Sequence, residues 1–322
     1  MKCPGLYCGR ELLPDGSWSD CGSCPRGFRA NETSYCVPCE GRPVFYDWLY
    51  LGFMTFSPLV LHWFCIDNTT HFRGRLSRGA LMLHLSALVE IVLAALATIL
   101  LVEPVGQLDL KACPVTSLSD WYTLFHNPRP NYTDVLHCTQ EAVYPLHTMV
   151  FIFYWLAVTA MLLIRPWLVR FCLPKTGGET IYAALYFFPI LSVLHAIFGG
   201  LIYYAFPYIV IVLSIISNAA HFAFKMDQSM RFLLVNTVTD VRNCMIVLGH
   251  WLVHGYGIIS LTELAEPALY GSLLCLVPSP AVFYILTARI TREKPICNIQ
   301  RIRENMFHFY LLFDEKEYIA SK

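Results

Sequence analysis

Residues 79–102 read GALMLHLSALVEIVLAALATILLV, and this stretch decides the class of fold. Its apolar residues follow one another in a long run, without the periodic apolar face of a soluble helix. Its single acidic residue is Glu90. A bilayer core of ~30 Å is crossed by ~20 apolar residues in a helix. The stretch therefore predicts a membrane-spanning helix.

The composition of the whole chain agrees with this prediction. Of 322 residues, 56% are hydrophobic and 14% are charged, against ~25% charged in a soluble domain. Basic and acidic residues number 23 each, so the net charge predicts no nucleic-acid partner. We predict an all-α polytopic membrane protein with seven transmembrane helices, in which residues 205–207 form a tight turn within a helical hairpin. Besides 79–102, the predicted segments are 45–65, 145–164, 181–204, 207–224, 232–252 and 268–287.

Four regions follow from these segments. Residues 1–44 form a small cysteine-rich head, and residues 45–288 form the transmembrane domain. Within that domain, residues 103–144 form one long loop. Residues 289–322 form a tail.

Lysine and arginine are unevenly distributed over the loops, and they collect on the cytosolic side of membrane proteins. The distribution predicts a luminal head and a cytosolic tail. Residues 1–4 do not resemble the apolar core of a signal peptide, so the first helix is expected to insert the chain with its N-terminus outside. Sequons at Asn31 and Asn131 then face the lumen and are expected to carry glycans, whereas Asn68 stays bare. The basic residues assigned to cytosolic loops are Arg73, Arg75, Arg78, Arg165, Arg170, Lys175, Lys225 and Arg231.

The head contains two CxxC pairs, and two interpretations compete for them. Four thiolates at this spacing suit a zinc ribbon. A translocated segment lies in an oxidising compartment, which favours disulfides, and residues 21–28 with 36–39 resemble extracellular EGF- and TNF-receptor-like cysteine repeats. The two cysteines of the long loop either pair with each other or are free thiols. The disulfide candidates are Cys3, Cys8, Cys21, Cys24, Cys36, Cys39, Cys113 and Cys138.

Charged residues within the predicted spans are functional candidates, because each costs ~3 kcal/mol on insertion scales. They are Glu90, Asp240 and Arg242. We hypothesise that Glu90 pairs with Arg242 across helices. The alternative is that such residues only hold helices together.

Other residues suggest two alternative functions. His250 and His254 lie one helical turn apart, and with Asp240, Glu90, His84 or His195 they would form a zinc site like that of the ceramidase and adiponectin-receptor superfamily. We favour the alternative that this histidine pair, flanked by Trp251 and Tyr256, is a polar anchor at the membrane interface. A G-protein-coupled receptor is disfavoured, because residues 164–167 lack the acidic-Arg-aromatic triplet and residues 278–284 lack an Asn before Pro.

The tail carries apolar residues at helical spacing, at 299, 302, 306, 309 and 313. This pattern predicts an amphipathic helix on the membrane surface or a docking face for a cytosolic partner. Arg301 and Arg303, followed by Phe307 and Phe309, loosely fit the docking peptides of mitogen-activated kinases.

The cysteine head, the junction YDWLYLGFM at residues 46–54, the seven segments and the basic tail together resemble the family of c-Jun N-terminal kinase-associated membrane proteins. The resemblance covers the full chain. It implies an endoplasmic-reticulum protein, with the plasma membrane as the alternative location. It also implies that the protein recruits the proteasome and ER-associated ubiquitin ligases to dispose of misfolded proteins, and that it prolongs stress-kinase signalling. The sequence shows no nucleotide-binding loop and no nucleophile–base pair, so we expect a non-enzymatic adaptor with no cofactor, in contact with membrane lipids.

Overall fold

The computed structural model describes residues 2–69, 78–128, 136–172, 178–225 and 227–288. The chain divides into two compact units. The first comprises Met1–Ile209 and Ile259–Ala265, and the second comprises Val210–Ile258 and Glu266–Lys322. Each unit is described by itself.

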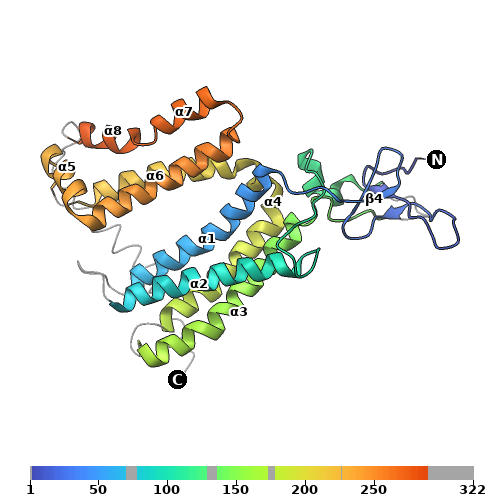
Figure 1. The fold of residues 1–322 in the computed structure, drawn as a ribbon, viewed down its shortest axis with the longest axis horizontal. Coiled ribbons are helices and arrows are strands. Elements are labelled where there is room, and N and C mark those ends of the chain that lie inside the picture. The colour runs from blue at the N-terminus through green and yellow to red at the C-terminus, as the bar shows by residue number, and fades with distance from the viewer. Residues whose placement is uncertain (1, 70–77, 129–135, 173–177, 226, 289–322) are drawn as a thin grey trace, which may run out of the picture. The chain divides into compact units, whose positions relative to one another are not determined.

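Three helices form the centre of the first unit: α1 (Phe45–Thr69), α2 (Arg78–Leu101) and α3 (Leu146–Cys172). Helix α2 packs against both of the others (Figure 1). Its buried face carries Ala80, Ala87 and Ala94, and small residues at an interface let membrane helices approach closely. The opposite face exposes large apolar side chains, as expected of a surface that contacts lipid.

Helix α4 (Gly178–Ala223) corrects the prediction of a separate turn at 205–207. The helical backbone continues through these residues, and the helix contains Pro189 and Pro207. A proline inside a helix removes one backbone hydrogen bond and can kink the helix without ending it. The boundary between the two compact units falls between residues 209 and 210, within one turn of Pro207.

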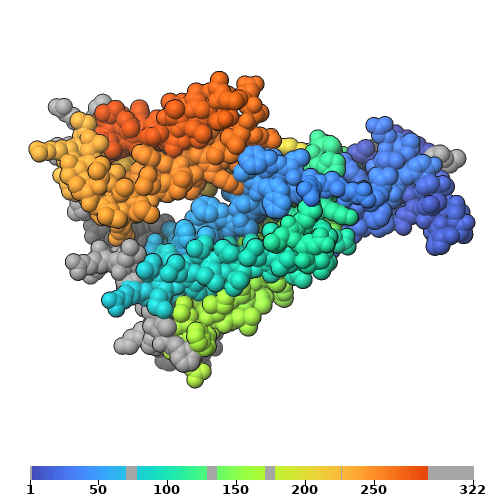
Figure 2. All heavy atoms as spheres, viewed as in Figure 1, coloured from blue at the N-terminus to red at the C-terminus, as the bar shows by residue number. Residues whose placement is uncertain are grey.

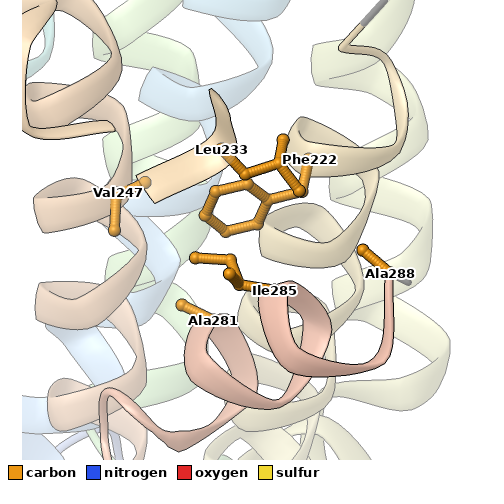
Figure 3. Packing of buried hydrophobic residues seen from close by; sticks show 6 residues of the cluster. All are labelled: Phe222, Leu233, Val247, Ala281, Ile285 and Ala288. Carbon is orange, nitrogen blue, oxygen red and sulfur yellow. The ribbon is translucent and has the colours of Figure 1, made fainter. Parts of the chain in front are cut away.

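The second unit contains the end of α4, α5 (Met230–Thr239), most of α6 (Val241–Thr262), α7 (Pro267–Cys275) and α8 (Ser279–Thr287). Figure 3 shows its core, to which each of these elements except α7 contributes an apolar side chain. The aromatic ring of Phe222 at the end of α4 stacks on Tyr284 of α8, with ring centroids 5.6 Å apart. The cluster consists of Phe222, Leu233, Val247, Ala281, Ile285 and Ala288.

The sixth predicted segment, 232–252, is also corrected. The helix breaks at Asp240, which is the C-terminal cap of α5, and α6 is the membrane-spanning candidate. The Asp240 carboxylate accepts hydrogen bonds from the backbone N–H of Arg242 and from the side chain of Asn243. Aspartate competes for backbone donors in this way and so favours helix starts over helix interiors.

Within the described residues, six helical segments are long and apolar enough to cross a membrane, and the last of them comprises α7 and α8. Helix α4 has 46 residues, or ~69 Å at 1.5 Å per residue, which is more than twice the hydrocarbon thickness. The predicted class of fold, an all-α membrane protein with a small cysteine-rich head, is therefore confirmed. The six spans are Phe45–Thr69, Arg78–Leu101, Leu146–Arg170, Gly178–Ala223, Val241–Thr262 and Pro267–Thr287.

The head contains two short antiparallel pairs of strands. Strand β1 (Cys8–Gly9) pairs with β2 (Gly22–Ser23), and β3 (Phe28–Ala30) pairs with β4 (Cys36–Pro38). The long loop adds two short 3-10 helices, η1 (Leu118–Trp121) and η2 (Thr123–His126). Figure 2 shows the green atoms of this loop against the blue atoms of the head.

Disulfides hold the head together and tie it to the loop. All eight candidate cysteines are paired in disulfides, so the zinc-ribbon interpretation of the head is wrong. Cys113 and Cys138 do not pair with each other, because each bonds to a cysteine of the head. The four disulfides are Cys3–Cys21, Cys8–Cys138, Cys24–Cys36 and Cys39–Cys113.

Candidate functional site

Asp120 joins the head to the long loop. Its Oδ1 accepts hydrogen bonds from the Arg29 guanidinium at 2.8 Å and from the Tyr7 hydroxyl at 2.9 Å. Its Oδ2 accepts from the backbone N–H groups of Thr116 and Ser117. Burial alone raises the pKa of Asp120. The hydrogen bonds from Thr116 and Ser117 and the charge of Arg29 outweigh burial, and the net pKa is lowered. Burial, together with the neighbouring carboxylate, also raises the pKa of Tyr7 to about 12.

The next residue, Trp121, joins the loop to the membrane helices. Its indole packs on Tyr203 and Tyr50, with ring centroids 5.2 and 5.7 Å away. Helix α4 presents Gly200 at this point, and a Cβ on Gly200 would lie 2.6 Å from the Cβ of Trp121. Only glycine permits this close approach. Two consecutive residues thus connect the head, the loop and the helices of the first unit.

Sequence reasoning missed Asp120 and Trp121. A signal was available, because residues 117–120 read SLSD and match the Ser-x-x-Asp pattern that begins a helix. That pattern marks a local turn. It does not show that the carboxylate also reaches Arg29 and Tyr7, which lie 91 and 113 residues away along the chain.

The junction at residues 46–54 has a structural role. Tyr203 of α4 donates a hydrogen bond to Asp47, and the Tyr46 hydroxyl donates to the backbone carbonyl of Tyr203. The Tyr50 hydroxyl lies 3.4 Å from Nδ1 of His195, also on α4. The polar residues of this junction therefore fix the head-proximal end of α1 against α4.

A buried ion pair lies deep between the helices of the first unit. Nη2 of Arg165 lies 2.5 Å from one Glu90 oxygen, and Nε of Arg165 lies 3.2 Å from the other. Both side chains have no exposed surface. Ser86 also donates to Glu90 at 2.5 Å. Bidentate geometry of this kind is the strongest arrangement for an arginine–carboxylate pair.

This pair corrects two expectations. Glu90 binds Arg165, not Arg242. Arg165 was assigned to a cytosolic loop, but α3 continues beyond residue 164 and carries Arg165 into the helix bundle. Burying a charge is costly unless it is paired and hydrogen-bonded, and α3 places the guanidinium beside the carboxylate that satisfies this condition.

Two more helices contribute to the ion-pair cluster. Nη1 of Arg165 lies 3.3 Å from Nδ1 of His62 on α1 and 3.4 Å from the Thr180 carbonyl on α4. A guanidinium only donates hydrogen bonds, so Nδ1 is the acceptor and His62 carries its proton on Nε2. His62 lies 17 residues beyond the start of α1, or ~26 Å along the helix. The cluster therefore lies toward the membrane side opposite the head.

In the second unit, polar groups of α4 and α6 pair across the helices. Ser214 hydrogen bonds with His254 at 2.9 Å, and Ser217 hydrogen bonds with His250 at 3.1 Å. Lys225 donates to Asn243, whose amide in turn donates to Asp240. Asp240 and Arg242 therefore lie at the beginning of α6 and not in the middle of a span. Interhelical hydrogen bonds of this type hold membrane helices together.

The histidines and acids of the zinc alternative have other partners. His84 lies 3.4 Å from Asp67, and His195 donates to the carbonyl of His147. Across the parts of the chain that the structure describes, no three His, Cys, Asp or Glu side chains gather closely enough to hold a metal ion. The geometry therefore does not favour the zinc-hydrolase alternative.

The remaining predicted sites lie on surfaces. Asn31 is exposed, and its Oδ1 accepts hydrogen bonds from the backbone N–H groups of Thr33 and Tyr35. Asn68 lies in the last turn of α1. Asn131 and the predicted docking residues Arg301, Arg303, Phe307 and Phe309 lie outside the described residues.

The chain is similar to known proteins over nearly its full length. The family model described as "JAMP: JNK1/MAPK8-associated membrane protein" matches residues 3–293. The human JNK1/MAPK8-associated membrane protein is 47% identical over 302 residues, covering 91% of this chain and 95% of the relative. The mouse protein of the same name is 46% identical, with the same coverage. A Caenorhabditis elegans homolog is 32% identical, covering 89% of this chain and 92% of the relative. No solved structure matches.

Proposed function

We propose that this chain, which belongs to the family of JNK1/MAPK8-associated membrane proteins, is a non-enzymatic adaptor of the endoplasmic-reticulum membrane that binds a c-Jun N-terminal kinase on its cytosolic side. The observation that carries the proposal is the full-length match to relatives whose names state this association. We further propose that the same cytosolic surface recruits the proteasome and ER-associated ubiquitin ligases.

The chemistry of the described residues supports an adaptor. The polar groups of the spans bind one another: Glu90 binds Arg165, Asp47 binds Tyr203, and His250 and His254 bind serines. These contacts hold helices together and leave partner binding to surface segments. The tail 289–322 follows the last span and contains more basic than acidic residues, and we assign the docking role to it.

The head supports the proposed orientation. Its four disulfides require an oxidising compartment, which the lumen provides and the cytosol does not. We assign the tail to the opposite, cytosolic side on the distribution of basic residues over the loops. In this orientation Asn31 also faces the lumen, where it would be accessible to glycosylation.

The kinase interaction is tested with the full-length protein in lipid nanodiscs and purified c-Jun N-terminal kinase. We expect the paired substitutions Arg301→Ala and Arg303→Ala, or Phe307→Ala and Phe309→Ala, to weaken binding about tenfold, which corresponds to ~1.4 kcal/mol. The matched control is Lys316→Ala with Lys322→Ala, which removes two positive charges from the same tail. Equal loss in the control would reduce the interaction to non-specific charge attraction, and unchanged binding in both docking variants would remove the tail from the site.

Proteasome recruitment needs a separate experiment. Microsomes that contain the full-length chain should retain added proteasomes better than microsomes that contain a variant truncated after residue 288. Equal retention would contradict recruitment through the tail while leaving kinase binding untouched.

A further inference from the structure

A shallow groove lies on the head side of the first unit, between loop residues 118–126 and helix α4. Its volume is about 400 Å³, which falls in the range of sites for small molecules. The loop contributes Leu118, Tyr122 and Phe125, and α4 contributes Ile197, Phe198 and Leu201. Polar groups occur at Ser119 and His126. The groove is therefore a mainly apolar trough with two polar side chains in its lining.

The α4 wall is continuous with a lipid-facing surface. Ile190, Val193, Ile197 and Leu201 are 59%, 56%, 55% and 50% exposed. They recur at three- and four-residue spacing, so they form one stripe along a membrane-spanning helix. Half-exposed isoleucine, valine and leucine on such a helix contact the hydrocarbon of the bilayer. The groove opens onto this stripe, so a lipid reaches it without leaving the membrane.

The loop wall is held in place by contacts with α4. Trp121 packs against Gly200, and the backbone N–H of Leu201 lies 3.3 Å from the Tyr122 hydroxyl. Phe125 nevertheless stays 80% exposed. A wall that is fixed before a ligand arrives costs little ordering entropy when the ligand binds.

The groove lies near the head-side end of the spans. Trp121 contacts Tyr50, which lies five residues beyond the start of α1, or ~7.5 Å along the helix. Tryptophan and tyrosine concentrate at membrane–water interfaces, and Tyr46, Trp121, Tyr122 and Tyr203 occur here together.

We propose that this groove binds one acyl chain of a phospholipid from the head-side leaflet. The chain lies between the loop wall and α4, with its methylene groups against Leu118, Phe125 and Ile197. A flexible chain enters laterally from the stripe on α4 and follows an open trough. The bound lipid thus covers Phe125, which otherwise exposes its ring.

The test uses the full-length protein in phosphatidylcholine vesicles that contain a phosphatidylcholine with a photoreactive diazirine on its acyl chain. We expect crosslinks on both walls, within 118–126 and within 197–201. The substitution Leu118→Trp fills the groove and should reduce labelling of 118–126 about tenfold. The matched control is Leu124→Trp, on the same segment but outside the lining, and it should label as the native chain does. Retention of the Cys8–Cys138 disulfide in each variant shows that the loop is still folded.

Three results would overturn the proposal. Labelling of 197–201 without 118–126 would indicate ordinary lipid around α4. Equal labelling in the Leu118→Trp and Leu124→Trp variants would show that the groove is not the site. Labelling of 118–126 by a photoreactive sterol, with none by the phosphatidylcholine probe, would assign the groove to a different lipid.

Discussion

The ion pair between Arg165 and Glu90 gives the sharpest prediction about stability. Both side chains are fully buried and share two hydrogen bonds, at 2.5 and 3.2 Å. Removing one partner of such a pair leaves the other charge buried and unpaired, at a cost of ~3–5 kcal/mol. We therefore expect Arg165→Met and Glu90→Met each to lower the free energy of unfolding by about that amount.

The double variant tests whether the two buried charges act as a pair. Replacing both partners with apolar side chains of similar size removes the unpaired charge, and such replacements are often neutral or stabilising. We expect the double variant to lose far less stability than the sum of the two single losses, and a neutral double variant makes the coupling energy as large as that sum. The assay is reversible unfolding of the purified protein in mixed micelles with increasing denaturing detergent.

Arg170→Met is the matched control, because Arg170 lies on the same helix but is exposed. It should stay within about 0.5 kcal/mol of the native chain. Single variants as stable as this control would contradict the expected cost of an unpaired buried charge. A double variant that loses the sum of the two single losses would show that the two residues act independently.

Three further predictions concern the head and loop. Folding lowers the pKa of Asp120 from 3.8, so the contribution of its carboxylate to stability is complete above that value and is lost as the pH falls through the lower folded value. Asp120→Asn should cost ~1–3 kcal/mol at neutral pH and should flatten the pH dependence of the unfolding midpoint between pH 5 and 2, measured by circular dichroism. Gly200→Ala should cost ~1–3 kcal/mol through overpacking against the neighbouring tryptophan and should speed proteolysis of the loop. Gly249→Ala, with nothing within 4 Å of the new Cβ, should change neither stability nor proteolysis, and equal proteolysis of the two variants would contradict the close packing at Gly200. Asn31→Gln should remove one glycan-dependent step in gel mobility and Asn68→Gln none, and the reverse result would invert the topology.

The membrane class and the approximate spans could be predicted because hydropathy is a property of the local sequence. Residues 79–102 and 45–65 lie within a few residues of α2 and α1. The fold departs from prediction where a polar residue competes for backbone hydrogen bonds, as at Asp240, or where helical bonding continues past a proline, as at Pro207. Both outcomes depend on the packing of neighbouring helices as well as on composition.

The pairs of residues that contact each other from distant parts of the sequence could not be predicted. Arg165 follows an apolar segment and precedes a proline, so its local sequence is that of a loop charge. Its burial depends on Glu90, 75 residues earlier. The cysteines show the same limit. Their number and compartment favour disulfides. However, Cys8 and Cys138 are 130 residues apart along the chain, and their spacing in the sequence does not predict that they pair.

The sequence by itself determined that this chain crosses a membrane and that it resembles its family, and it favoured disulfides in the head, because hydropathy, cysteine content and short motifs are properties of residues that are close together in the chain. Only the tertiary structure decided which charge pairs with which, which cysteines bond across the loop, and that Asp120 and Trp121 connect the head to the helices. These contacts join residues far apart in sequence, and the energy of each depends on burial and distance, which exist only once the helices have packed.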